Sequence, residues 1–325
     1  MTKKYWNLIK ETTEPGLELT QKEWLFIEPY LTDHRLEGHI YKFFGPLLPP
    51  SLKEKLSVQW QSQWLKNHLY LKELQVLNQL SKAACLNFIV LKGAAMLPVL
   101  YPDLGSRQMS DLDLLVSGNE TIAFQNMLLI NGYHKVNSTA WKANKFKATF
   151  TKTIQSFDLV VEVHSKLFLS ESPDLSWQST GQDLKVLTPT DHLIHLMGHF
   201  SYQHTFLKLF WLMDIDRWIR RYDKEINWAR LVNISEKLRM KKAINATLWM
   251  THQFLGTPVP EALHRPLSPV QKIFLTENFI WKTKFNLSYY LMKFDLKDSL
   301  KDTLEYSALW LIQKTKQIFS RLQIP

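Results

Sequence analysis

The first eighty residues carry apolar side chains at helical spacing. The segment Thr-Gln-Lys-Glu at 20–23 has the form of a helix-capping box, and Trp24, Ile27 and Leu31 follow it at helical intervals. Gly-Pro and Pro-Pro pairs between residues 45 and 50 interrupt this pattern. From residue 51 to residue 80, leucine and tryptophan recur without proline or glycine. This second stretch predicts one long amphipathic helix, so the region 1–80 is expected to be helical.

The pattern changes between residues 81 and 187, where short apolar runs alternate with helical segments. Strands are expected at 88–91, 112–116, 147–152 and 158–164, and helices at 94–100 and 120–130. Asn131-Gly132 is a typical helix end, and Gln155-Ser156 separates the last two strands as a hairpin turn would. The order strand, helix, strand, helix, strand, strand predicts a small mixed sheet with helices on it.

Helical spacing returns after residue 188. Thr188 precedes a proline suited to a first helical turn, and Asp191 places an acid in the same turn. Further helices are expected at 228–255 and, after a proline-rich loop, at 270–322. The chain therefore predicts an α+β fold, with a small mixed-sheet core at 81–187 between helical regions at 1–80 and 188–325.

Composition is typical of a well-packed globular protein, with 45% apolar residues and 12 tryptophans. The single cysteine, Cys85, excludes an internal disulfide and a thiolate metal cluster. No apolar stretch reaches the roughly 18 residues of a membrane span, so we expect a soluble, cytoplasmic protein. The net charge of +10 favours polyanionic ligands such as nucleotides or nucleic acid. The basic residues are spread along the chain, however, which favours solvated helix faces over an RNA-binding surface.

Candidate metal ligands gather around the apolar run at 112–116. Asp111 and Asp113 are two residues apart, and residues at this spacing project from the same face of a strand. Their carboxylates suit Mg²⁺, which prefers oxygen ligands and nucleotide phosphates. A third acid completes such a site, and Glu162 has valines on both sides in the expected strand at 158–164. Glu162 reaches the same pocket if the two strands are neighbours.

Basic and small residues upstream of the aspartates indicate phosphate binding. Lys92 and Gly93 end the first strand, where a small residue lets phosphate approach the backbone and a lysine neutralises it. Ser106 and Arg107 offer a hydroxyl and a guanidinium that binds phosphate bidentately. Ser110 either contacts phosphate or caps the turn.

Two of these residues have structural alternatives. Arg107 has the alternative of a salt bridge to Asp103 or Asp111. His164 either supports Glu162 from outside the metal site or is a buried, hydrogen-bonded histidine of the core.

Two further polar patterns fall on expected helices. Asp214 and Asp216 repeat the Asp-x-Asp spelling, but residues two apart on a helix point about 200° apart and cannot share one metal. We expect Asp214 to bond to a neighbouring helix. Asp191, His195 and His199 share a helix face, and the apolar residues beside them favour a polar helix seam over a zinc site.

These motifs resemble the nucleotidyltransferase superfamily, in particular its uncharacterised bacterial nucleotidyltransferase-like branch. The likeness rests on Leu-Lys-Gly at 91–93, on Gly-x-Arg-x-x-x-Asp-x-Asp at 105–113, and on hydrophobic-acid-hydrophobic-His at 161–164. It extends over about residues 80–240. In one departure, Lys92-Gly93 stands where better-known members carry a Gly-Gly or Gly-Ser turn.

The resemblance implies a DNA polymerase beta-like core in which Asp111, Asp113 and Glu162 hold two Mg²⁺ or Mn²⁺ ions. It implies transfer of a nucleoside monophosphate from a nucleoside triphosphate, such as ATP, to a hydroxyl, an amine or a protein side chain. A small molecule or a protein is favoured over RNA as the acceptor. The alternative is a noncatalytic module that keeps the fold within a biosynthetic complex or a toxin–antitoxin pair, which the Lys92-Gly93 departure supports.

Overall fold

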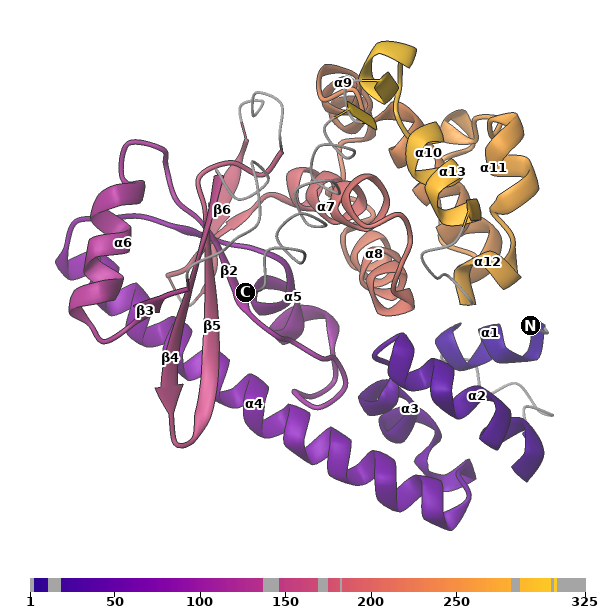
Figure 1. The fold of residues 1–325 in the computed structure, drawn as a ribbon, viewed down its shortest axis with the longest axis horizontal. Helices are drawn as coiled ribbons and strands as arrows, with labels where there is room; N and C mark the ends of the chain where they lie inside the picture. The colour runs from indigo at the N-terminus through magenta and orange to yellow at the C-terminus, as the bar shows by residue number, and fades with distance from the viewer. Residues whose placement is uncertain are drawn as a thin grey trace, which may run out of the picture.

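The computed structural model describes residues 3–10, 19–136, 146–168, 175–181, 183–281, 287–304 and 307–308 of the chain. These residues have the α+β architecture expected from the sequence. A seven-stranded mixed sheet is formed by the middle of the chain, and helical regions precede and follow it (Figure 1). No helix within these ranges is both long and apolar enough to cross a membrane.

The sheet has the strand order β3-β4-β5-β2-β1-β7-β6. Its strands are β1 (Ile89–Val90), β2 (Leu112–Leu115), β3 (His134–Lys135), β4 (Lys147–Ile154), β5 (Phe157–His164), β6 (Trp177–Ser179) and β7 (Lys185–Leu187). The β4–β5 hairpin turns at Gln155 and Ser156, whose positive φ angles of 48° and 68° suit a tight turn. β2 lies between β1 and β5 and runs parallel to β5. The two strands expected to carry the acids are therefore neighbours.

Three helices accompany the sheet: α4 (Pro50–Ala83), α5 (Lys92–Leu100) and α6 (Thr121–Ile130). α4 is the long helix expected from residue 51 onward. Its C-terminal half packs into the hydrophobic core of the sheet through Leu69, Tyr70, Leu74 and Leu77. Leu112 and Leu114 of β2 point into the same core. Because successive strand residues face opposite sides, this places Asp113 on the other face.

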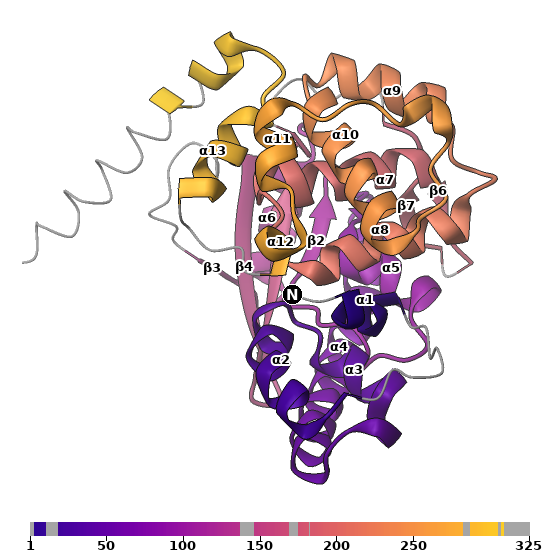
Figure 2. The same ribbon diagram turned by 90° about the vertical axis from the view of Figure 1, so that its right-hand side faces the viewer.

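The helices of the two chain ends share a second core. α1 (Lys3–Lys10), α2 (Gln21–Asp33) and α3 (Glu37–Phe44) lie directly below the C-terminal helices in Figure 2. Trp6 and Trp24 belong to one hydrophobic cluster with Leu212 and Trp281. The ring of Trp6 stacks on Phe254 with 4.8 Å between centroids. The N-terminal helices therefore complete the core of the C-terminal region.

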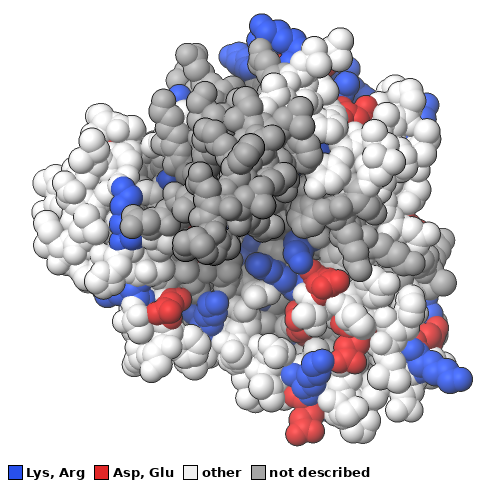
Figure 3. Space-filling model, viewed as in Figure 1, with Lys and Arg blue, Asp and Glu red and all other residues white. Residues whose placement is uncertain are grey.

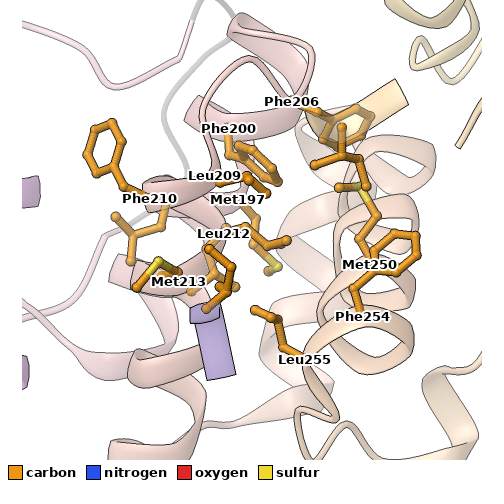
Figure 4. Packing of buried hydrophobic residues seen from close by; sticks show 14 of the residues in the cluster. Met197, Phe200, Phe206, Leu209, Phe210, Leu212, Met213, Met250, Phe254 and Leu255 are labelled. Carbon is orange, nitrogen blue, oxygen red and sulfur yellow. The ribbon is translucent and has the colours of Figure 1, made fainter. Parts of the chain in front are cut away.

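The C-terminal region begins with α7 (Pro189–Met197) and α8 (Leu209–Tyr222). The helices that follow are α9 (Trp228–Lys237), α10 (Lys241–Met250), α11 (Pro269–Phe274), α12 (Glu277–Trp281) and α13 (Leu287–Asp295). Short π or 3-10 turns lie at Gly45–Leu47, Gly198–Gln203, Thr251–Leu255 and Glu261–Leu263. Figure 4 shows Met197, Leu212 and Met250 meeting between these helices, with Phe210 at one edge of the cluster.

The structure departs from the expected elements in two broken helices and three additional short strands. The helix expected at 228–255 divides into α9 and α10 because Arg239 takes a left-handed φ of 54°. One helix was expected at 270–322, but the described part of this span contains α11, α12 and α13. The first break follows α11, because the next residue, Leu275, has a non-helical ψ of 69°. Residues 309–325 lie outside the described ranges. The short strands β3, β6 and β7 were not expected.

Candidate active site

The side chains of Asp113 and Glu162 come from neighbouring strands. β2 and β5 are parallel, and Asp113 stands opposite Glu162 in their register. Their apolar neighbours face the core of the sheet, so both carboxylates project from its other face. His164 lies on the same face of β5, and its Nε2 is 2.8 Å from Asp113 Oδ1 and 3.6 Å from Glu162 Oε2. The three side chains form one polar cluster.

Two lysines neutralise these carboxylates. Lys92 Nζ donates to Asp113 Oδ1 at 2.8 Å, and Lys147 Nζ donates from β4 to Glu162 Oε1 at 2.7 Å. The Asp113 side chain is only 3% exposed and accepts from both Lys92 and His164. A buried carboxylate stays charged only with such partners, because burial removes the water that would otherwise stabilise it.

Asp111 lies immediately before β2 and lines the same cavity as Asp113 and Lys92. The hydroxyl of the adjacent Ser110 favours the charged form of its carboxylate. Asp111 is partly exposed, whereas Asp113 is buried. The two-residue spacing therefore brings both aspartates to one cavity but into different surroundings.

These surroundings separate the proton affinities of the two aspartates. Burial, followed by the charge of Asp113, raises the pKa of Asp111 to about 6. Burial acts in the same direction on Asp113, but Lys92 and His164 outweigh it and hold the pKa of that carboxyl well below its usual value. Burial would lower the pKa of His164, yet its hydrogen bond to Asp113 and the nearby carboxylate of Glu162 raise it. Neighbouring groups with such divergent pKa values are typical of functional sites.

A small, open cavity of about 70 Å³ lies beside these groups. This volume is well below the roughly 300–1,000 Å³ of typical small-molecule sites. Besides the two aspartates and Lys92, its lining consists of Arg35, Gly93, Arg107, Gln108, Met109, Ser110, His199, Phe210 and Trp211. Figure 3 shows that basic and acidic side chains also lie next to one another near the middle of the face drawn there.

Lys92 and Gly93 occupy the start of α5. Lys92 has a φ of 45°, in the left-handed region that favours glycine. Gly93 lies against Arg107, and a Cβ at this position would come within 2.6 Å of Arg107 Nη1. The small residue expected for phosphate approach is therefore also required by side-chain packing.

Arg107 forms a buried bidentate salt bridge with Asp214 of α8. Nε donates to Oδ1 at 2.9 Å and Nη2 donates to Oδ2 at 2.7 Å. The alternative partners expected from the sequence, Asp103 and Asp111, are wrong, because α8 packs against α5 and brings Asp214 to the guanidinium. Ser106 is buried, donates to Asp103 Oδ1 at 2.9 Å and is not among the residues that line the cavity.

The helical placement of the second Asp-x-Asp pattern is confirmed, since Asp214 and Asp216 both lie on α8. Asp214 bonds to Arg107 and Tyr101, which lie in the segment after α5 and not in a neighbouring helix as expected. Asp216 instead accepts from Thr257. The two carboxylates therefore serve different parts of the structure.

The polar face of α7 is occupied by packing contacts. Asp191 forms a salt bridge of 2.8 Å with Arg230. His195 is buried, and neither of its ring nitrogens has a hydrogen-bond partner in the described structure. Among the described residues, the group of ligand atoms close enough for a metal consists of Asp113, Glu162 and His164, which favours the polar seam over a zinc site on α7.

The sequence alone did not single out Lys147, which pairs with Glu162, or the cavity residues Arg35 and Trp211. Lys147 pairs with His164 in the β4–β5 register, and the alternation of 147–152 would have placed it on the same face as Glu162. Arg35 and Trp211 enter from helical regions far away in sequence, where no local spacing marks them.

The donor set fits a divalent cation. One oxygen each of Asp113 and Glu162 and one ring nitrogen of His164 lie within 4.8 Å of one another. Carboxylate oxygens suit Mg²⁺, and an imidazole nitrogen extends the range to Mn²⁺ and other transition metals. Asp111 offers a further carboxylate in the adjoining cavity.

Comparisons with known proteins found one weakly similar solved structure and one matching protein family. A solved structure of an antigenic nucleotidyltransferase-like protein from Paracoccidioides brasiliensis is 13% identical to this chain, with a TM-score of 0.34. The similarity covers 54% of this chain and 91% of that one. No curated protein matches the chain. A family model described as uncharacterised nucleotidyltransferase matches residues 21–256, and because this match spans well over half of the sequence, the chain belongs to that family.

Proposed function

We propose that this protein is a metal-dependent nucleotidyltransferase that moves a nucleoside monophosphate from a nucleoside triphosphate to an acceptor. One observation carries the proposal: Asp113 stands beside Glu162 in the register of β2 and β5, and Asp113 lines a cavity together with Asp111 and Lys92. Three carboxylates and a lysine are the groups that divalent cations and phosphates require.

In this proposal, Asp111, Asp113 and Glu162 hold Mg²⁺ or Mn²⁺ ions in a two-metal arrangement. His164 either contributes its Nε2 or keeps the carboxylates in place. When bound, the metal neutralises phosphate charge and lowers the proton affinity of the acceptor.

The phosphates would contact the side chain of Lys92 and the neighbouring Gly93 and Ser110, all of which line the cavity. Ser106 and Arg107 would support the phosphate site, Ser106 from outside the cavity lining and Arg107 from within it. Their hydrogen bonds to Asp103 and Asp214 fix the segment that leads into Asp111.

The transfer step needs a proton acceptor, and Glu162 has suitable properties. Burial would raise the pKa of Glu162, but the nearby His164 and a hydrogen bond from Lys147 lower it, so the carboxylate is ionised at neutral pH. The acceptor oxygen or nitrogen bonds to the α-phosphorus, and the bond from that phosphorus to the pyrophosphate oxygen breaks. Pyrophosphate leaves, and the proton of the acceptor passes to Glu162.

The proposal has wider features, which concern origin, location, donor and acceptor. We propose that the chain belongs to the polymerase beta-like superfamily, that it comes from a bacterium and that it acts in the cytoplasm. ATP is the donor we favour, and a small molecule or a protein side chain is the favoured acceptor. The division into 1–80, 81–187 and 188–325 would then separate the core from helical regions that shape the acceptor site.

The proposal is tested with labelled nucleoside triphosphates and Mg²⁺ in the presence of cell extract. We expect wild type to produce a labelled product, and Asp111→Asn/Asp113→Asn to produce at least a hundredfold less. Asp158→Asn is the matched control, because Asp158 is an exposed carboxylate on β5 outside the cavity, and it should leave labelling unchanged. If neither wild type nor Asp158→Asn yields labelled product, the enzyme proposal is wrong.

One observation favours a second candidate, a noncatalytic nucleotide-binding module. Lys92 already supplies Asp113 with a cation at 2.8 Å, in the place where a catalytic site needs a metal. Such a protein would be stabilised thermally by nucleotide, yet would yield no labelled product with any extract.

A further inference from the structure

The cavity beside Asp111 and Asp113 has a second, aromatic wall. His199, Phe210 and Trp211 line it, and all three come from the C-terminal helical region. The carboxylates and Lys92 come from the sheet-bearing part of the chain. The cavity therefore joins a charged side with an aromatic side.

Trp211 is the residue of this wall best suited to receive a flat ligand. Its ring is only partly buried, whereas His199 and Phe210 are buried. The His199 ring meets it edge-on, with centroids 4.7 Å apart and planes at 88°, and the Phe210 ring lies 5.1 Å away. His204 adds a third ring at 4.9 Å. These neighbours hold the indole in place, so a ligand that stacks on it need not order it first.

The wall is fixed relative to the carboxylates. Asp214 lies one turn after Trp211 on α8 and holds Arg107, whose guanidinium also lies over the Phe210 ring at 5.2 Å from its centroid. Arg107 stands four residues before Asp111 in the chain. The buried salt bridge therefore ties the aromatic wall to the segment that presents the aspartates.

Cations lie at the boundary between the two sides. Arg35 lines the cavity, with its guanidinium 5.7 Å from the centroid of Phe210. Lys92 lines the cavity next to Asp113. A ligand that reaches from the aromatic wall to the carboxylates thus passes two positive charges.

We propose that Trp211 forms the base-binding subsite of this cavity, so that the nucleobase stacks on its indole while the phosphates extend past Arg35 and Lys92 toward Asp111 and Asp113. This inference rests on the proposed function, since it assigns the base end of the same nucleotide. Stacking on an aromatic face accepts any base, because every base offers a π surface. The wall then distinguishes a nucleotide from free phosphate.

The test compares two ligands that share phosphates and differ in the base. With Mg²⁺ present, the affinity of the protein is measured for inorganic triphosphate and for the α,β-methylene analogue of ATP, which cannot donate its nucleoside monophosphate. We expect wild type to bind the analogue at least tenfold more tightly. Trp211→Leu should weaken analogue binding about tenfold and leave triphosphate binding within twofold, whereas Trp211→Phe should keep most of the preference.

Trp249→Leu is the matched control. Trp249 is also partly buried in a C-terminal helix and packs on Phe254, but it does not line the cavity. This variant should bind both ligands as wild type does.

A fluorescence measurement extends the test to a variant that keeps an aromatic ring. The emission that wild type has and Trp211→Phe lacks comes from Trp211. The ATP analogue should quench this emission, and triphosphate should leave it unchanged. An unchanged preference in Trp211→Leu, equal loss of both ligands, or the absence of quenching would each overturn the base-binding subsite and leave the nucleotide site standing. Failure of wild type to bind either ligand would instead remove the proposed function itself.

Discussion

At the scale of single residues, Asp111 and Asp113 differ more than their spacing implies. Both carboxyls lose hydration, but only Asp113 receives Lys92 and His164 as partners. Burial and then the negative charge of Asp113 raise the pKa of Asp111 to about 6, although the charge of Lys92 and the hydroxyl of Ser110 act in the opposite direction. One aspartate is therefore fully charged at neutral pH, while the other holds its proton into the weakly acidic range.

The raised pKa of Asp111 predicts a pH-dependent gain in stability for Asp111→Asn. The folded protein binds this proton more tightly than the unfolded chain does, whose carboxyl has the usual pKa of 3.8. The stabilising contribution of the group is therefore complete below pH 4 and is lost as the pH rises through about 6. At pH 7.5 we expect the free energy of unfolding of Asp111→Asn to exceed that of wild type by about 1–3 kcal/mol. Near pH 4 the two proteins should be equally stable.

Chemical denaturation without divalent cations, at several pH values, measures this difference. Ser110→Ala is a useful comparison. The Ser110 hydroxyl favours the charged form of Asp111, so its loss should raise the pKa of Asp111 further. A constant difference between Asp111→Asn and wild type across this pH range would contradict the prediction.

At the scale of elements, the loop between α5 and β2 is held from two sides. From the C-terminal side, Asp214 of α8 binds Arg107. From the N-terminal side, Gly38 of α3 lies so close that a Cβ on it would be 1.9 Å from the carbonyl oxygen of Gly105. Helices from both ends of the chain thus determine where the aspartate-bearing segment lies.

Arg107→Leu should destabilise the protein by about 3–5 kcal/mol, because Asp214 would remain buried without its cation. The side chains of Arg107 and Asp214 are only 5% and 1% exposed. Lys55→Ala is the control, since the Lys55 side chain is 57% exposed in its salt bridge to Glu28. That variant should lose less than about 1 kcal/mol in urea unfolding. Similar small losses in both would show that the buried pair is not a structural anchor.

Gly38→Ala should be destabilising by about 3 kcal/mol, near the upper end for overpacking, because the atom it meets is backbone and cannot rotate away. It should also weaken nucleotide binding through movement of Gly105 and the residues that follow. Gly118→Ala has open space around its Cβ and no positive φ, so its melting temperature should stay near that of wild type. A wild-type melting temperature for Gly38→Ala would refute the close contact.

At the scale of the whole molecule, two hydrophobic cores meet along shared elements. The first half of α4 contributes Leu52 and Leu56 to the core of the helical regions, and its second half contributes Leu69 and Leu74 to the core of the sheet. The segment from β1 to α5 also contributes side chains to both cores. The proposed boundaries near residues 80 and 187 therefore separate stretches of sequence whose side chains pack in shared cores.

The shared core predicts that damage near the N-terminus is felt near the C-terminus. Trp24 is 1% exposed and packs in the core that also contains residues of α8, α10 and α12. We expect Trp24→Ala to lower the free energy of unfolding by about 3–5 kcal/mol and to speed amide hydrogen exchange in α8 and α10. Trp177→Ala, at a position 49% exposed on β6, serves as the comparison and should change exchange only locally. Unchanged exchange in α8 and α10 of Trp24→Ala would mean that the two ends fold independently.

Much of this arrangement could be predicted from local pattern. The alternation at 158–164 and the spacing of Asp111 and Asp113 were enough to expect three carboxylates near one another, and the capping box at Thr20 is present as expected. The partner of Arg107 could not be predicted, because Asp214 is distant in sequence and lies on a helix whose packing has no local signature. The position of Trp211 in the cavity could not be predicted either, because it depends on the packing of α8 against α5.

Lys92 has a consequence for the order in which ligands associate. Its ammonium shares Asp113 Oδ1 with His164, so a divalent ion arriving alone competes with a cation tethered to the protein itself. An ion that arrives already chelated by a nucleotide brings phosphate oxygens, with which the Lys92 ammonium can pair instead of with Asp113. On the proposed function, free metal therefore binds weakly and the metal–nucleotide complex binds as a unit. Lys92 makes occupancy of the acidic cluster conditional on the substrate.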